Sequence, residues 1–188
     1  MDYFVAPDAF QTDRFTLRCY RPGDGAALSE AVNASYDHLK TYMAWVKPHQ
    51  DEEESERLVR QFRARWLQAT DFVIGAFAPD GSRLLGGCGY HLREGGLEVR
   101  SAEMGMWIRG DRAGAGLGTD VLRALLDWGF SDTWPWLRLS WRCDTRNLAS
   151  IRVAEKAGLA HEGVLKSHLL SPQGERRDTV CFAALRPR

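Results

Sequence analysis

The sequence predicts a single mixed α/β domain, in which a mostly antiparallel sheet of about seven strands is flanked by about four helices. Three observations predict it. The chain has 188 residues, which is the size of one domain. Strand-like and helical runs follow one another in the order βααβββαβαββ. No repeat or low-complexity linker divides the chain. We therefore expect residues 1–188 to fold as one unit.

The first third of the chain predicts one strand and two helices. Residues 14–21 (RFTLRCYR) alternate apolar and polar side chains, the period of a strand with one exposed face. Asp24 follows a Pro-Gly break and can cap a helix that runs to about Ser35. A second helix is expected from Asp51 to about Ala69, because acidic residues fill its first turn and apolar residues then recur at helical spacing.

Three strands are predicted next. Residues 72–78 end at a Pro-Asp-Gly turn, residues 84–92 end at a Glu-Gly-Gly loop, and the third strand covers residues 97–108. Gly105 interrupts the third strand, and an isolated glycine in a strand indicates a bulge or a close backbone approach.

The last third of the chain predicts two helices, a strand between them and a final hairpin. The helices are expected from about residue 119 to 130 and from about 149 to 157, and the strand from 136 to 143. Gly158 ends the second of these helices. The hairpin turns at residues 171–174 (SPQG).

Composition and charge argue against several classes of protein. The 25 basic and 25 acidic side chains give a net charge of zero, which speaks against nucleic acid or an anionic membrane as the partner. No apolar run approaches about 18 residues, and the first residues lack the layout of a secretion signal. The four cysteines (Cys19, Cys88, Cys143 and Cys181) form no CxxC pair or Cys/His cluster, so we expect free thiols, no metal site and a cytoplasmic protein.

The most informative segment is a glycine loop at residues 109–119 (RGDRAGAGLGT), which leaves a strand and enters a helix. Its glycines allow positive φ and a close approach of backbone N–H groups to a ligand, and the helix N-terminus favours an anion such as phosphate. A P-loop needs Lys and Ser or Thr after its last glycine, and a dinucleotide fingerprint needs glycine where Thr119 stands. Both nucleotide interpretations fail, and a glycine-rich connector without a ligand is the alternative.

A second segment, residues 147–159 (NLASIRVAEKAGL), places Ser150 one turn after Asn147, which can cap the helix. Taken together with the glycine loop and residues 102–108 (AEMGMWI), it resembles the GNAT acyltransferase superfamily, and most closely the ribosomal-protein N-terminal acetyltransferases of the RimJ/RimL type. The opening TDRFTLR and the closing Glu162, Gly163, Lys166, Gly174 and Asp178 also follow that family's order, so the resemblance covers nearly the whole chain.

The resemblance implies acetyl-CoA as the acetyl donor and no metal. The pantetheine arm would pair with the backbone of Met106, Trp107 and Ile108, as a peptide pairs with a strand edge. The loop residues implied to contact CoA, chiefly its pyrophosphate, are Arg112, Ala113, Gly114, Gly116, Leu117, Gly118 and Thr119. Asn147 matches a residue that binds pantetheine, Ser150 matches one near the thiol, and Lys156 either reaches a CoA phosphate or is solvated.

Two positions depart from the family pattern. Many members have Gln or Arg where this chain has Ala113, a change for which Arg112 could compensate. Phe182 stands where a tyrosine often follows the late aspartate, so a tyrosine acid is excluded there and more weight falls on Ser150.

Amine acetylation needs a base for the ammonium group, a donor to the oxyanion and a proton for the departing thiolate. Glu103 matches the base of some relatives, with a solvent-facing or salt-bridged strand residue as the alternative, and Glu162 is the second-choice carboxylate. We expect the backbone N–H of Trp107 or its neighbour to meet the oxyanion and Ser150 to donate to the sulfur. Direct attack in a ternary complex is implied, because no activating base stands beside Cys143 in the sequence.

The acceptor site is expected between the first two helices and the last hairpin. Tyr42 and Trp45, in the connector between those helices, could cover the amine and attract it by cation–π interaction, although ordinary packing explains them equally well. The resemblance implies the α-amine of a protein N-terminus as acceptor. A small amine (a polyamine, an amino acid or an antibiotic) and a CoA-binding sensor without turnover are the alternatives. A homodimer is among the expected assemblies, since relatives of this type often dimerise.

Overall fold

The computed structural model describes residues 4–187, and it confirms the predicted mixed α/β class. One sheet of eight strands runs through it in the order β1-β2-β3-β4-β5-β6-β8-β7. The strands are β1 (Ala9–Gln11), β2 (Thr16–Cys19), β3 (Phe72–Phe77), β4 (Leu84–His91), β5 (Ser101–Ile108), β6 (Arg138–Asp144), β7 (Ala160–Leu170) and β8 (Arg176–Leu185). All neighbours pair antiparallel except β5 and β6, which run parallel.

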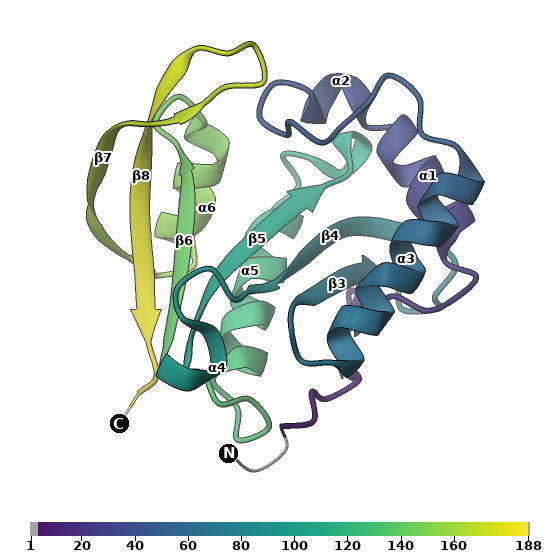
Figure 1. Cartoon of the computed structure of the whole chain (residues 1–188), viewed down its shortest axis with the longest axis horizontal. Helices are drawn as coiled ribbons and strands as arrows, with labels where there is room; N and C mark the ends of the chain where they lie inside the picture. Colours follow the sequence, from purple (N-terminus) through teal and green to yellow (C-terminus); the bar gives the residue numbers. More distant parts are fainter. Residues whose placement is uncertain (1–3, 188) are drawn as a thin grey trace.

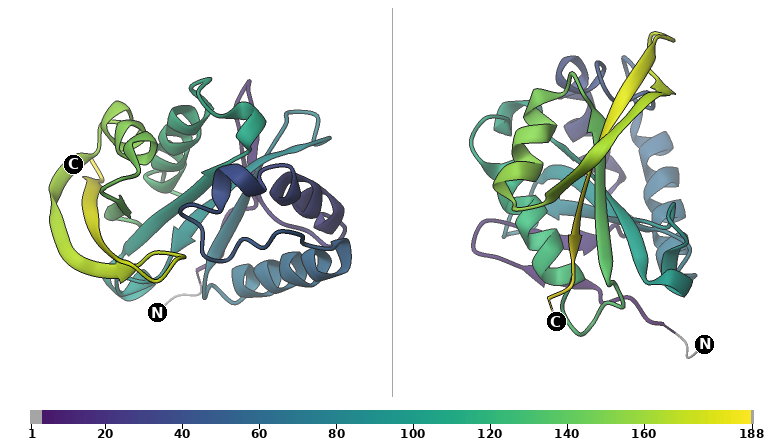
Figure 2. Two further views of the ribbon diagram at one scale, coloured as in Figure 1. Left: turned by 90° about the horizontal axis from the view of Figure 1, so that it is seen from above. Right: turned by 90° about the vertical axis from the view of Figure 1, so that its left-hand side faces the viewer.

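Helices cover both faces of the sheet. They are α1 (Gly25–Asn33), α2 (Tyr36–Leu39), α3 (Glu52–Leu67), α4 (Gly96–Val99), α5 (Leu117–Gly129) and α6 (Leu148–Lys156), with one 3-10 turn, η1 (Gly110–Arg112). Figures 1 and 2 show α1 and α3 on one face, which we call the front face, and α5 and α6 on the other, the back face. Within residues 4–187, no helix combines the length and the apolar character that crossing a bilayer requires.

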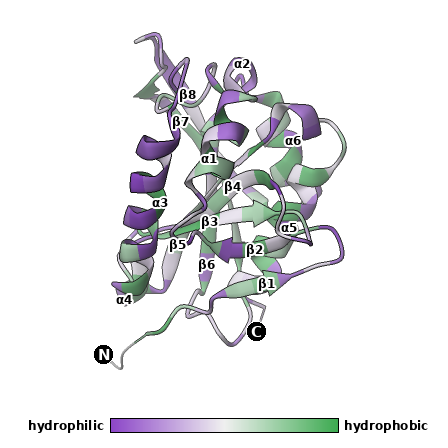
Figure 3. Ribbon diagram, turned by 90° about the vertical axis from the view of Figure 1, so that its right-hand side faces the viewer, coloured by the Kyte–Doolittle hydropathy of each residue, from purple (hydrophilic) through white to green (hydrophobic). Residues whose placement is uncertain are grey.

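Two apolar clusters join these layers. The larger includes Val121 and Leu125 of α5 against Met104 and Leu139 of the sheet, all at most 1% exposed. The smaller lies on the front face and includes Leu28 of α1, Val59 of α3 and Phe77 of β3. Each fully buried side chain of this size stabilises the fold by roughly 1.5–3 kcal/mol. The outer surface of α3 is hydrophilic, as an amphipathic helix over one sheet face should be (Figure 3).

The structure differs from the predicted elements in detail. A short strand, β1, adds an eighth strand by pairing with β2. Residues 97–99, expected in a strand, form α4, because Gly95 and Gly96 take positive φ and turn the chain into one helical turn. The β4–β5 register runs without a shift through Gly105, so this glycine marks a close approach and not a bulge. Helix α5 begins at Leu117, two residues before the expected Thr119.

Candidate active site

The two parallel strands in the middle of the sheet pair over only half of their length. β5 pairs with β6 from Ser101–Arg138 to Met104–Trp141, and then the pairing ends. Beyond that point β5 stays with β4, while β6 stays with β8 as far as Asp144. We call the unpaired edge between residues 105–108 of β5 and the end of β6 the strand gap. Figure 1 shows the two strands diverging there.

Backbone hydrogen bonds at both ends of β5 fix which peptide groups face the strand gap. The carbonyl of Arg100 accepts from Leu137 on the β6 side at 2.7 Å, and the N–H of Arg109 donates to Leu85 on the β4 side at 3.0 Å. Because strand peptides alternate sides, even-numbered residues of β5 direct their backbone groups to β6 and odd-numbered residues to β4.

The backbone groups along the strand gap are therefore those of Met106 and Ile108. An extended chain can pair with them as a strand pairs with an exposed sheet edge. We expected the N–H of Trp107 or of its neighbour to meet the oxyanion. The Trp107 N–H is directed to β4, and the N–H of its neighbour Met106 faces the strand gap.

The glycine loop lies next to the strand gap. Gly114 and Gly116 have φ of +78° and +81°, and nothing lies within 4 Å of a Cβ placed on either one. Glycine is therefore favoured at both positions by the positive φ and not by lack of space, because the surroundings of both residues are open. A Cβ on Gly118 would lie 3.5 Å from the Met106 side chain, which places the start of α5 beside β5.

The N-terminus of α5 has no side-chain cap, because its N-cap residue is Gly116. The N–H groups of Leu117, Gly118 and Thr119 in the first turn thus lack intrahelical acceptors, as at any helix start. Arg112 is exposed at the end of η1, and Ala113 follows it in an extended conformation. A diphosphate fits this donor set, since it is an anion that needs several N–H donors and a cation.

Helix α6 brings Ser150 to the base of the strand gap. Asn147 caps the helix, its Oδ1 accepting from the Ser150 N–H at 3.1 Å. The Ser150 hydroxyl oxygen accepts from the indole Nε1 of Trp141 at 3.1 Å, and Trp141 is the last residue of β6 paired with β5. Lys156 is exposed at the far end of the same helix.

Cys143 follows two residues after Trp141 on the same strand and also neighbours Ser150. Burial raises the pKa of the Cys143 thiol, and hydrogen bonding with Ser150 and Trp141 only partly opposes this. A thiol with a raised pKa carries little thiolate at neutral pH and is a poor nucleophile. The raised pKa thus disfavours Cys143 as a nucleophile.

The two predicted carboxylates are both ion-paired. Glu103 is 10% exposed and accepts from Arg93 Nη1 at 2.6 Å, with Arg142 Nη1 3.7 Å from its other oxygen. Glu162 lies beside Arg138, at the paired end of β6 and away from the strand gap. Hydrogen bonds from the Arg138 guanidinium lower the pKa of Glu162. The ion pairs of Glu103 agree with the alternative stated for it, a salt-bridged strand residue.

The connector after α2 crosses to the other half of the molecule. The Tyr42 hydroxyl donates to the Arg146 carbonyl at 3.1 Å, and Arg177 of β8 donates to the Thr41 carbonyl at 3.3 Å. The Arg177 guanidinium also lies 5.5 Å from the centre of the Tyr42 ring. The expected neighbourhood of this connector and the last hairpin is thus present.

Trp45 packs near the strand gap. Its ring centre lies 6.2 Å from that of Trp107, and its side chain is half exposed. The structure therefore brings the predicted lid residue Trp45 to the front of β5, while Tyr42 holds the connector in place.

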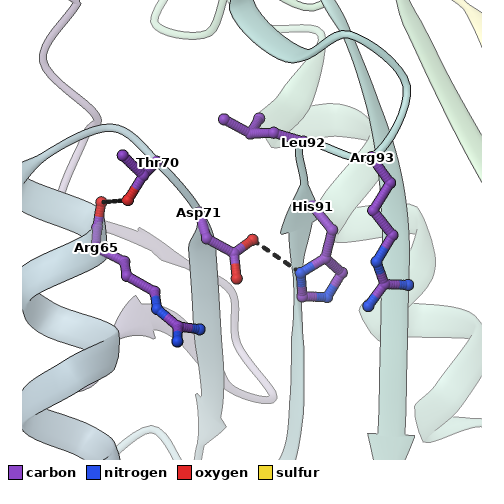
Figure 4. A pocket seen from close by; sticks show the side chains of 6 residues that line it. All are labelled: Arg65, Thr70, Asp71, His91, Leu92 and Arg93. Atoms are coloured by element: carbon purple, nitrogen blue, oxygen red, sulfur yellow. Dashed lines mark hydrogen bonds and ion pairs between the residues drawn. The ribbon is translucent and has the colours of Figure 1, made fainter.

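A histidine–aspartate pair to which we assigned no role from the sequence lies on the front face. His91 Nδ1 is 2.9 Å from Asp71 Oδ1, and the two residues border a pocket of about 350 Å³ (Figure 4). They are 20 residues apart, and no motif links them. The β3–β4 register, which pairs Phe72 with Tyr90, is what brings them together. Among residues 4–187, no group of His, Cys, Asp and Glu is arranged to hold a metal ion.

Comparison with known proteins gives a consistent family. Residues 14–160 match the family model of the acetyltransferase (GNAT) domain. The "Probable N-acetyltransferase YjcK" of Bacillus subtilis (strain 168) is 26% identical over 136 residues, which are 72% of this chain and 73% of YjcK.

Solved structures share the fold at low sequence identity. RimL, a ribosomal L7/L12 α-N-protein acetyltransferase solved with coenzyme A in a disulfide to a cysteine, has a TM-score of 0.84 at 19% identity, over 95% of this chain and 98% of RimL. The microcin C7 self-immunity acetyltransferase MccE, solved with acetyl-CoA and AMP, has a TM-score of 0.83 at 18% identity, over 97% and 98% of the two chains.

Proposed function

Because this chain belongs to the family of GNAT acetyltransferases, we propose that it transfers the acetyl group of acetyl-CoA to the α-amine of a protein N-terminus by direct attack in a ternary complex. The observation that carries the proposal is the strand gap with an uncapped helix N-terminus beside it. The gap offers an extended chain a row of backbone partners, and the helix N-terminus offers a diphosphate its donors.

In this proposal CoA lies along the unpaired half of β5. The amides of its pantetheine arm pair with the backbone of Met106 and Ile108, and its pyrophosphate accepts from the N–H groups at the start of α5. The open glycines support this placement, because no protein atom lies within 4 Å of a Cβ at 114 or 116, and this open space adjoins the start of α5. Arg112 adds a positive charge, Asn147 borders the arm, and Lys156 is the further candidate for a CoA phosphate.

The Met106 N–H meets the carbonyl oxygen of the acetyl group as negative charge develops on it. A preorganised donor of this kind contributes about 10²–10³ in rate. Ser150 protonates the departing sulfur. Since the Trp141 indole donates to the Ser150 oxygen, the hydroxyl takes part in that hydrogen bond as acceptor and keeps its proton for donation to a sulfur.

The acceptor reaches the acetyl group from the front face, below the connector that carries Tyr42 and Trp45. RimL, which has the same fold, is named for acting on the α-amine of a ribosomal protein, and this supports a polypeptide N-terminus as acceptor. A small amine is the second candidate. Two observations favour a small amine. The Tyr42 hydroxyl is hydrogen-bonded to the Arg146 carbonyl on the side where we place the acceptor, and the acetyltransferase MccE has the same fold.

The release of free CoA thiol from acetyl-CoA tests the proposal and separates the acceptors. Peptides that begin with Ser or Ala, a polyamine and single amino acids would be compared at equal concentration. Acetylation of the peptides supports the first acceptor, and acetylation of a polyamine or amino acid supports the second. Thermal stabilisation by acetyl-CoA without thiol release over the whole panel would contradict turnover and leave the sensor.

A further inference from the structure

The His91–Asp71 pair has the geometry of an oriented proton acceptor. Asp71 stands directly before β3 and His91 is the last residue of β4, next to the Phe72–Tyr90 pair, and each side chain is 20% exposed. The Asp71 carboxylate can only accept a hydrogen bond when ionised, so the proton of the neutral imidazole is on Nδ1. His91 Nε2 is then left with a free lone pair.

His91 Nε2 lies over the first residue of the strand gap. Gly105 follows Met104, the last residue of β5 that pairs with β6. A Cβ on Gly105 would lie 2.9 Å from His91 Nε2, so any side chain at this position would displace the imidazole. The Nε2 lone pair thus lies beside Gly105, the residue that precedes Met106 in β5. We assign the Met106 N–H to the acetyl carbonyl.

The two oxygens of the Glu103 carboxylate already have cationic neighbours. Arg93 donates to one oxygen at 2.6 Å, and Arg142 Nη1 lies 3.7 Å from the other. His91 stands opposite Glu103 in the β4–β5 register, so both side chains project from the same face. Of the two, only the imidazole has an unpartnered acceptor atom directed at Gly105.

The pocket beside the pair gives a proton a route to solvent. Its lining is completed by Arg65, Thr70, Leu92 and Arg93, and Figure 4 shows the Asp71 carboxylate turned to the imidazole. Asp71, just before β3, contacts the imidazole, and Arg65 of α3 and Arg93 after β4 line the same pocket. Glu103 of β5 lies opposite His91 in the sheet, with Arg142 of β6 beside it.

We propose that His91, oriented by Asp71, is the base that deprotonates the acceptor ammonium, an inference that rests on the acetyl transfer proposed above. One proton passes from the ammonium nitrogen to Nε2, which forms an imidazolium beside Asp71. The neutral amine then forms a C–N bond with the acetyl carbon, and the C–S bond breaks. A second proton leaves the nitrogen and reaches the sulfur through the Ser150 hydroxyl. The imidazolium finally gives its proton to water in the pocket.

Replacement of the imidazole by an amide that cannot titrate tests the role directly. In His91→Gln, kcat/KM for the acceptor at neutral pH should fall by about 10²–10⁴-fold, the usual contribution of a positioned base. Its activity should recover as the pH rises and the amine loses its proton in solution. The Kd of acetyl-CoA, measured by calorimetry, should change less than twofold. Added imidazole should partly restore a His91→Ala variant, which a merely structural role would not allow.

Two controls separate this inference from the proposed function. His161→Gln, on β7 against Phe182, should keep the wild-type rate and pH profile. The ¹⁵N shifts of the His91 ring should show a proton on Nδ1 in wild type and lose that preference in Asp71→Asn, a readout that needs no turnover. If the wild-type protein releases no CoA with any amine, the proposed function is contradicted. The position of the proton on the His91 ring then still tests whether Asp71 orients the imidazole. An active enzyme whose His91→Gln variant keeps the wild-type pH profile overturns the role of His91, as does a proton on Nε2.

Discussion

Trp141 pairs with Met104 at the last step of the β5–β6 ladder, and its indole N–H also donates to the hydroxyl of Ser150. One residue thus stands at the last paired step, holds the proposed acid and belongs to the buried core, at 4% exposure. The strand gap and the first turn of α6 are therefore fixed relative to one another by core packing. We expect both to keep their geometry when surface residues of the loop are changed.

Ser150→Ala should lower turnover more than donor affinity. The hydroxyl is assigned to the departing sulfur, so we expect kcat to fall by about 10²-fold or more, while the Kd of acetyl-CoA changes little. Steady-state thiol release and calorimetry measure the two quantities. Ser131→Ala is the matched control. The Ser131 hydroxyl donates to the Trp128 carbonyl at the C-terminal end of α5, whereas the proposed CoA site lies at the N-terminal end. Equal kcat in the two variants would remove Ser150 from the mechanism.

Gly116→Val should abolish CoA binding without unfolding the chain. Valine at φ +81° is strained by roughly 1–2 kcal/mol, and its side chain would enter the open space next to the first turn of α5, where we place the pyrophosphate. Gly81→Val is a close control, because Gly81 has φ +73°, equally open surroundings and a place in the β3–β4 turn. Both variants should lose similar stability in urea. Only Gly116→Val should lose the heat of CoA binding, and equal binding by both variants would exclude the loop.

The glycine loop could be predicted from the sequence because its information is local. Gly114 and Gly116 have the positive φ that their spacing indicated, and α5 starts beside them. The strand gap could not be predicted in the same way. Residues 105–108 are as compatible with a strand as residues 101–104, and their separation from β6 arises because β6 continues with β8 instead.

The ion pairs of the site were also beyond local prediction. Arg93 lies ten residues before Glu103 and Arg142 almost forty residues after it, so their meeting on one carboxylate depends on the order of strands in the sheet. The same holds for Asp71 and His91, which only the β3–β4 register joins. A sequence pattern reports side-chain types and spacing along one element, whereas these contacts cross several elements.

Glu30→Gln should weaken the support of the glycine loop in a pH-dependent way. Arg109, just before η1, is 1% exposed and is held by Glu30 of α1 and by Asp111. Hydrogen bonding from Arg109 lowers the pKa of Glu30, although desolvation opposes it. Glu30 is half exposed and Asp111 remains, so we expect a loss of about 1–2 kcal/mol in the free energy of unfolding at pH 7.

The sign of the pH dependence follows from the lowered pKa of Glu30. The pair stabilises the fold fully above the unfolded-state value of about 4.3 and loses its contribution as the pH falls through the lower folded-state pKa. The stability difference between wild type and Glu30→Gln should therefore be constant from pH 6 to 7 and shrink toward pH 3 in urea titrations. Glu53→Gln, in an exposed pair with Arg57, is the control and should show almost no difference.

Cys143 should report the position of the CoA thiol. Incubation with CoA disulfide should form a mixed disulfide at Cys143, with one CoA thiol released per bond, because we place the thiol beside Ser150. The rate should rise with pH, since burial raises the pKa of Cys143 and keeps the thiolate scarce near pH 7. Peptide mass spectrometry locates the adduct, and acetyl-CoA should protect against it. Cys143→Ser should keep the wild-type kcat within about threefold, and complete inactivity would instead indicate an acetyl-cysteine intermediate.

Tyr42→Phe should affect the acceptor and leave the donor unchanged. The variant keeps the ring beside Arg177 but loses the hydroxyl that donates to the Arg146 carbonyl, a bond worth about 0.5–1.5 kcal/mol. The connector is then held less firmly, so we expect the KM of the acceptor to change severalfold while the Kd of acetyl-CoA stays constant. Tyr36→Phe, in α2 on the same segment, is the control for loss of a tyrosine hydroxyl, because its ring lies near Lys40 and not near β8.

A peptide acceptor should bind more weakly if the connector covers it, whereas a gain in rate would show that the connector limits its entry. An unchanged KM for every acceptor would mean that Tyr42 only packs, and the acceptor would then have to enter from another side of the strand gap.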